Sequence, residues 1–189
     1  MKRITLFFVL FVIISLLSIS NSYSEVMYNI NYPEVKDESK EASEKLSQVF
    51  SLLFDAIESL EQSDFTVARA KWMTMLELMH KAYDYIMIIE EKVSPGSINI
   101  DSIPSPQRKM IEDNFEKFEL EIPKDKTSLV KLTSHVVFEF LKYLSSIEFG
   151  DNFHRTRLVF DQIFDKMWRF MKLGISVSEI AASDKNVIS

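Results

Sequence analysis

Residues 65–93 read FTVARAKWMTMLELMHKAYDYIMIIEEKV, and this stretch decides the fold class. Its apolar residues recur every three or four positions, which keeps them on one face of an α-helix. Ser94-Pro95-Gly96 ends the pattern, because proline cannot continue a helix and glycine suits the turn that follows. The sequence therefore predicts one long amphipathic helix from Phe65 to Val93. Its expected buried face consists of Phe65, Ala68, Trp72, Met75, Leu76, Met79, Tyr83, Ile86 and Ile89.

Three more stretches show the same helical spacing on either side of this one. We expect them to form helices from about Ser39 to Gln62, Lys126 to Phe149 and Phe153 to Leu173. Short breaks separate the first helix from the second and the third from the fourth, so the four helices pair into two hairpins. The predicted fold is all-α, an antiparallel four-helix bundle of two helical hairpins.

A long crossover, residues 94–126, joins the two predicted hairpins and contains four of the five prolines. Inside it, Ser105-Pro106 starts a short extra helix, because serine suits the N-cap and proline the first helical position. The bundle domain is expected to span residues 39–180. A loosely docked N-terminal arm (residues 25–38) precedes it, and a frayed C-terminus (residues 181–189) follows it.

The first 24 residues predict the destination of the chain. Met1-Lys2-Arg3 is a short basic start, and Ile4 to Ile19 is an uncharged apolar run. Small residues at Ser22 and Ser24 suit signal peptidase, so residues 1–24 read as a secretory signal peptide. The apolar run is shorter than the roughly 20 residues that a spanning helix needs, although an uncleaved segment would leave a membrane anchor. We expect an exported bacterial protein, periplasmic or secreted, with no membrane span after cleavage.

Composition narrows the class of function. The chain carries 22 Lys and Arg against 28 Asp and Glu, a net charge of −6, so by overall charge it is a poor candidate for binding nucleic acid or anionic lipid. It has no cysteine, which excludes disulfides, thiolate metal sites and covalent haem attachment through cysteine. Its three histidines and the absence of a nucleophile-elbow or glycine-rich phosphate motif favour a protein without catalytic activity.

The two predicted hairpins repeat a short pattern that contains the candidate ligand-binding residues. Phe65, Arg69 and Trp72 recur in spacing as Phe153, Arg157 and Phe160, 88 residues later. Either an ancient duplication or the common helical period accounts for this likeness. Each arginine lies one turn into its helix, on the side we assign as apolar. They form either a paired anion clamp or contacts to helix ends and carboxylates such as Asp55 and Glu58. The candidate ligand-binding residues are Arg69, Trp72, Arg157 and Trp168.

Metal and haem sites receive less support. Glu77 and His80 match half of a di-iron signature. The nearest second half, Asp151 to His154, is expected near the opposite end of the bundle, too far away to share a metal. His80 and His135 are expected at the surface or its boundary. Methionines such as Met79 and Met167 occur at core spacing, where methionine usually fills gaps beside aromatic rings. We therefore predict no metal site and no cofactor.

These observations favour a non-catalytic binding or interaction module of the cell envelope, whose partner is a protein or a small anionic ligand. An alternative is a periplasmic bundle that binds a small molecule, metal or haem through Trp72, Trp168, Met79, Met167 and the arginine pair. A weaker alternative is a hydrolase with an unrecognised carboxylate site.

Overall fold

The computed structural model describes residues 28–147 and 153–183, with side chains of the last segment described from Gln162 onward. Every regular element in these residues is helical, which confirms the all-α class. The long helices are α2 (Lys36–Glu61), α3 (Phe65–Lys92), α5 (Lys126–Ser145) and α6 (Phe153–Ser183). Two 3-10 turns, η1 (Pro33–Val35) and η2 (Ile100–Ser102), and the shorter helix α4 (Ser105–Lys117) complete the described fold.

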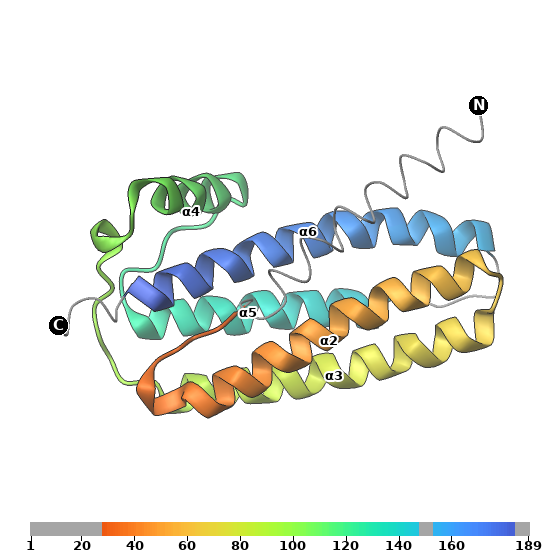
Figure 1. Cartoon of the computed structure of the whole chain (residues 1–189), viewed down its shortest axis with the longest axis horizontal. Helices are drawn as coiled ribbons and strands as arrows, with labels where there is room; N and C mark the ends of the chain where they lie inside the picture. The colour runs from red at the N-terminus through yellow and green to blue at the C-terminus, as the bar shows by residue number, and fades with distance from the viewer. Residues whose placement is uncertain (1–27, 148–152, 184–189) are drawn as a thin grey trace.

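The four long helices lie alongside one another, and α4 lies across the α6 side of the molecule (Figure 1). The most extensive contact among the described helices is between α2 and α3. Helix α3 also packs on α5, and α5 packs on α6. The contact between α2 and α3 is much more extensive than the one between α5 and α6 among the described residues, so the two pairs are unequal. Aromatic rings join α2 to α6, with the Phe50 and Phe170 centroids 6.0 Å apart. None of the described helices is long and apolar enough to cross a membrane.

The apolar pattern places the expected residues in the core. Trp72, Met75 and Met79 of α3 are buried, as are Leu53 of α2 and Leu144 of α5.

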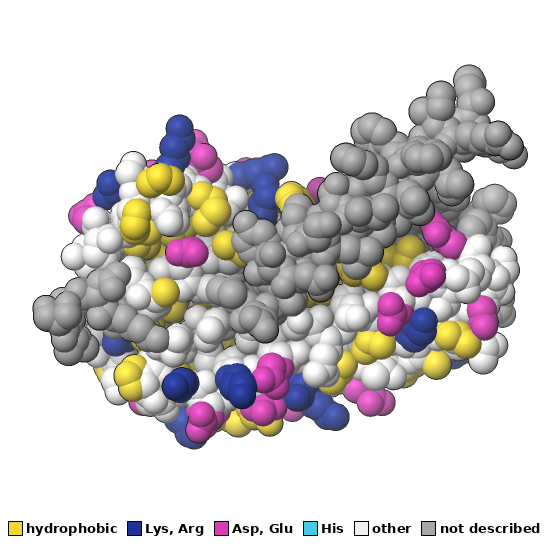
Figure 2. Space-filling view, in the orientation of Figure 1, with side chains coloured by type: hydrophobic (Ala, Val, Ile, Leu, Met, Phe, Trp, Pro, Cys, Tyr) yellow, Lys and Arg dark blue, Asp and Glu magenta, His cyan; other side chains and the backbone are white. Residues whose placement is uncertain are grey.

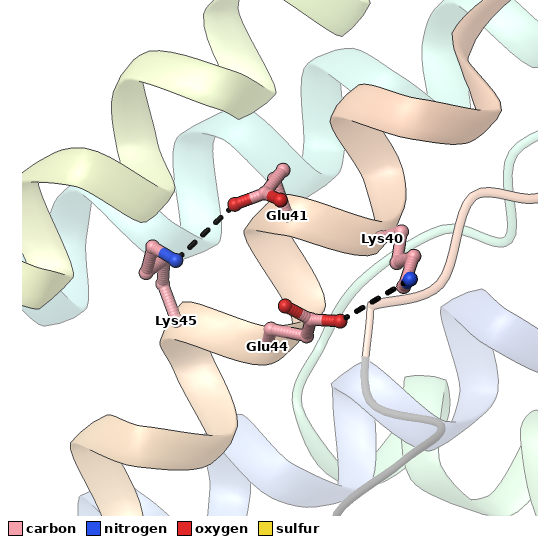
Figure 3. A network of polar contacts seen from close by, with 4 residues as sticks. All are labelled: Lys40, Glu41, Glu44 and Lys45. Atoms are coloured by element: carbon pink, nitrogen blue, oxygen red, sulfur yellow. Dashed lines mark hydrogen bonds and ion pairs between the residues drawn. The ribbon is translucent and has the colours of Figure 1, made fainter.

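The outer surface is charged. On α2, the ion pairs Lys40–Glu44 and Glu41–Lys45 join residues one turn apart (Figure 3). Charges of both signs are interspersed over the face seen in Figure 2.

The N-terminal arm differs most from its expectation. Residues 28–35, which we call the N-terminal strap, are not loosely docked, since Tyr28, Ile30, Tyr32 and Val35 are all buried. The Tyr28 hydroxyl donates to the Phe170 carbonyl oxygen (2.8 Å), and the Asn29 N–H donates to Ser178 Oγ (2.9 Å). The segment is therefore a strap whose alternate apolar residues pack against the helices. Helix α2 begins at Lys36, three residues before its predicted start.

Helix α6 continues ten residues beyond the predicted end at Leu173. Glycine in a helix interior usually weakens the helix, by about 1 kcal/mol relative to alanine. In the structure Gly174 is helical, and the Tyr28 ring lies against the space that a side chain would fill. Of the residues expected to fray (181–189), the first three belong to α6, where Ala181 and Ser183 are buried.

The crossover is held at both ends. The Ile98 N–H donates to the Lys124 carbonyl oxygen (2.9 Å) and the Lys126 N–H to the Gly96 carbonyl oxygen (2.8 Å), so its two ends lie side by side. The predicted short helix is present as α4, and its Ile111 and Phe115 are buried. Asn114 Nδ2 of α4 donates to Ser176 Oγ of α6 (3.0 Å). This attachment fixes the end of α4 beside α6.

Asp125 caps the first turn of α5 and should make stability depend on pH. Its carboxylate accepts from the Ser128 hydroxyl (2.7 Å) and the Ser128 N–H (2.8 Å), and these bonds hold its pKa below the ordinary value of 3.8. The stabilisation is therefore present above the unfolded-state pKa and lost as pH falls through the lowered one. We expect Asp125→Ala to lower the melting temperature at neutral pH, and the difference from wild type to vanish in acid. For the control Asp113→Ala, at an exposed position of α4, we expect no difference in melting temperature from wild type that shrinks as the pH falls.

Candidate functional site

A groove of about 490 Å³ runs between α5 and α6, and the chain that leaves α4 closes one side of it. We call it the α5–α6 groove. Its floor is apolar and consists mainly of Phe140 of α5 with Phe170 and Leu173 of α6, all buried. The Phe140 and Phe170 rings stack, with centroids 4.5 Å apart. Phe118 and Leu120, which follow α4, form the adjoining wall.

The helical period of α5 explains this lining. Val136, Phe140 and Tyr143 recur at three and four positions, so they face α6 together. His135, Glu139, Lys142 and Ser146 follow the same spacing one position away and form the outer rim. From His135 to Ser146 the rim extends about 16 Å at the rise of an α-helix.

Two cations of α6 lie over aromatic rings from other elements. Lys166 Nζ is 4.8 Å from the centroid of the Tyr143 ring, and Arg169 Cζ is 4.9 Å from that of Phe118. Each cation therefore faces a ring from a different neighbouring element. Such contacts contribute about 0.5–1 kcal/mol at exposed sites. Neither cation forms an ion pair with any of the described carboxylates, so both charges remain available to an anion.

The remaining charged groups of the rim leave it positive. Lys142 lies 3.8 Å from Glu139, but both side chains are at least half exposed, and such pairs are weak. Among the described residues, Glu139 is the single carboxylate that lines the groove, against Lys142, Lys166 and Arg169. Burial raises the pKa of Tyr143, so its hydroxyl stays protonated at neutral pH and is able to donate a hydrogen bond.

A second cleft of about 360 Å³ adjoins the groove on the other side of Arg169. Its lining includes Lys117, Phe118, Glu119, Asp165 and Trp168. Trp168 is 38% exposed, and Lys172 Nζ lies 5.2 Å from its ring centroid. Because acidic and basic groups are balanced here, the second cleft is a weaker anion site than the α5–α6 groove.

Of the four predicted ligand-binding residues, the structure describes the side chains of Arg69, Trp72 and Trp168. Arg69 is exposed on α3, so its assignment to the apolar side was wrong. Trp72 is 2% exposed and belongs to the core, whereas Trp168 lines the second cleft. The side chain of Arg157 lies outside the described residues.

The helix-end contacts expected for Arg69 are made by Lys71 instead. Lys71 Nζ donates to the carbonyl oxygen of Asp55 (3.2 Å) and to Ser59 Oγ (3.0 Å), near the end of α2. Two positions along a helix turn a side chain through more than half a circle, which separates Lys71 from Arg69.

The residues considered for metal or haem are dispersed. Met79 and Met167 are buried among apolar side chains. His80 is exposed, His135 is exposed at the rim of the groove, and the side chain of His154 lies outside the described residues. No group of three or more His, Asp or Glu in the described part of the chain could hold a metal ion.

The sequence pattern did not single out four residues of the groove: Lys166, Arg169, Phe118 and Tyr143. Lys166, Arg169 and Leu173 recur at three and four positions, a pattern that also describes any solvated helix edge. The aromatic partners come from α5 and from the end of α4, so the grouping depends on how α4 docks. Comparisons with protein-family models, curated proteins and solved structures find no match to this chain.

Proposed function

We propose that this protein is an exported, non-catalytic binding protein of the bacterial cell envelope, and that the α5–α6 groove binds an anionic partner. The observation that carries the proposal is the pair Lys166 and Arg169, held over aromatic rings and without an ion pair to any described carboxylate. Cations placed at the edge of an apolar floor are suited to a partner with one charged and one apolar part.

The proposal extends to architecture and location. In it, α2, α3, α5 and α6 are an antiparallel four-helix bundle of two hairpins, with α4 on the crossover. The pattern of residues 1–24 supports export and removal of a signal peptide. Glu139, the one carboxylate among the described residues that lines the groove, lies beside Lys142, and a single carboxylate beside a cation supports binding over acid–base hydrolysis.

Native mass spectrometry of the protein purified from its own host tests this proposal. We expect a bound species on a chain whose intact mass corresponds to residues 25–189. The double variant Lys166→Met/Arg169→Met should lose that species, because methionine keeps the length and helix propensity of the side chain but removes the charge.

The matched control is Lys81→Met/Lys109→Met, which removes the same charge from exposed positions on α3 and α4. It should retain the bound species. A wild-type protein with nothing bound, or a species retained equally by both double variants, would contradict the proposal.

A further inference from the structure

We infer that the occupant of the α5–α6 groove is a single-chain amphiphilic anion. Its charged head would lie between Lys166 and Arg169, and its aliphatic chain along the floor of Phe140, Phe170 and Leu173. The inference rests on the proposed function and adds the chemical class of the ligand.

The size of the groove favours a small ligand. Its volume of about 490 Å³ lies within the usual range of small-molecule sites, about 300–1,000 Å³.

The walls favour an aliphatic chain over an extended peptide. Peptides that bind in extended form usually pair their backbone with an exposed sheet edge. The groove lies between helices α5 and α6, whose own backbone groups are bonded within each helix. The floor of Phe140 and Phe170 offers an extended peptide no backbone partners, whereas a hydrocarbon chain needs none.

Charge selects the head group. The lining contains Lys142, Lys166 and Arg169 against Glu139, so the groove is locally positive in a chain of net charge −6. The planar guanidinium of Arg169 is able to bind a carboxylate or phosphate through two hydrogen bonds, and Lys166 adds a point charge. An anionic head therefore gains attraction where a cationic head would be repelled.

Isothermal titration calorimetry on the exported chain, stripped of ligand, tests the inference with dodecanoate below its micelle concentration. We expect saturable binding of one dodecanoate per chain. Butanoate, which has the same head and little chain, and dodecyltrimethylammonium, which has the same chain and the opposite charge, should bind at least about tenfold more weakly. Lys166→Met/Arg169→Met should weaken dodecanoate binding roughly tenfold or more, and Lys81→Met/Lys109→Met should not.

Other results overturn the inference in distinguishable ways. Equal binding of dodecyltrimethylammonium would show that charge plays no part. Binding to phosphatidylglycerol vesicles without binding of free dodecanoate would point to a membrane surface, and binding of an acidic peptide alone would point to a protein. In the last two cases, a host-derived species that still depends on Lys166 and Arg169 would leave the proposed function intact. If binding of the host-derived species also did not depend on Lys166 and Arg169, both proposals would be contradicted.

Discussion

Replacement of Trp72 by alanine should lower the free energy of unfolding by about 3–5 kcal/mol, the usual cost of removing a large aromatic side chain from a core. Trp72 is 2% exposed and lies on the same face of α3 as the fully buried Met75 and Met79. The cavity left by the indole cannot collapse fully, because the surrounding side chains are themselves enclosed by packed helices. Urea denaturation followed by circular dichroism measures the change.

Met73→Ala is the matched control for Trp72→Ala. Met73 is the next residue along α3 but is 52% exposed, so its truncation should change the free energy of unfolding by less than about 0.5 kcal/mol. The comparison also decides the role of Trp72. A stable Trp72→Ala protein that loses its ligand would restore Trp72 to the binding site, whereas a destabilised protein assigns it to the core.

Gly174→Ala should destabilise the protein by about 2 kcal/mol, although the same change inside an isolated helix would stabilise it by about 1 kcal/mol. A Cβ at this position would lie 2.6 Å from Cε2 and 2.7 Å from Cδ2 of Tyr28. The Tyr28 ring cannot move aside easily, because its hydroxyl donates to the Phe170 carbonyl and its ring packs on that of Phe170, with centroids 4.6 Å apart. The added methyl group must therefore displace the strap.

A double-mutant cycle makes this prediction specific. In a Tyr28→Ala background the clash is absent, so Gly174→Ala should raise the free energy of unfolding by about 0.5–1 kcal/mol. The sign of the effect should thus reverse between the two backgrounds. Destabilisation of equal size in both would show that Gly174 matters for a reason other than Tyr28.

The helical content could be predicted because it depends on local spacing. The α3 pattern placed the start of the helix at Phe65 and its end within one residue of Lys92. Helix ends governed by contacts distant in sequence were not predictable. Gly174 looks like a stop signal unless Tyr28 is known to pack against it, and Tyr28 is far away in the chain.

The strap was unpredictable for a related reason. Residues 28–32 form no regular helix or strand, and although Tyr28, Ile30 and Tyr32 alternate with asparagines, their burial depends on a surface made by other elements. Tyr28 also adopts a φ of 57°, a left-handed conformation that is rare for a bulky residue. Tertiary packing must offset that cost, and packing of this kind depends on residues distant in the sequence.

The candidate site could be predicted only in its residue types. Arginine and tryptophan were selected as binding residues, yet the groove uses Arg169, and Trp168 lines the neighbouring cleft. The choice between Arg69 and Arg169 depends on which face of each helix its neighbours cover. That information lies in the docking of α4 and in the stacking of Phe118 under Arg169.

The strap also has a consequence for the timing of folding. Tyr28 contacts Phe170, a residue 142 positions later, so the two ends of the described chain close on each other. Contacts of such long sequence separation form slowly, because a large loop must close first. If the chain is exported as proposed, a polypeptide that enters a translocation channel N-terminus first cannot seat Tyr28 until α6 has emerged on the far side. Completion of the native state would therefore await the arrival of α6.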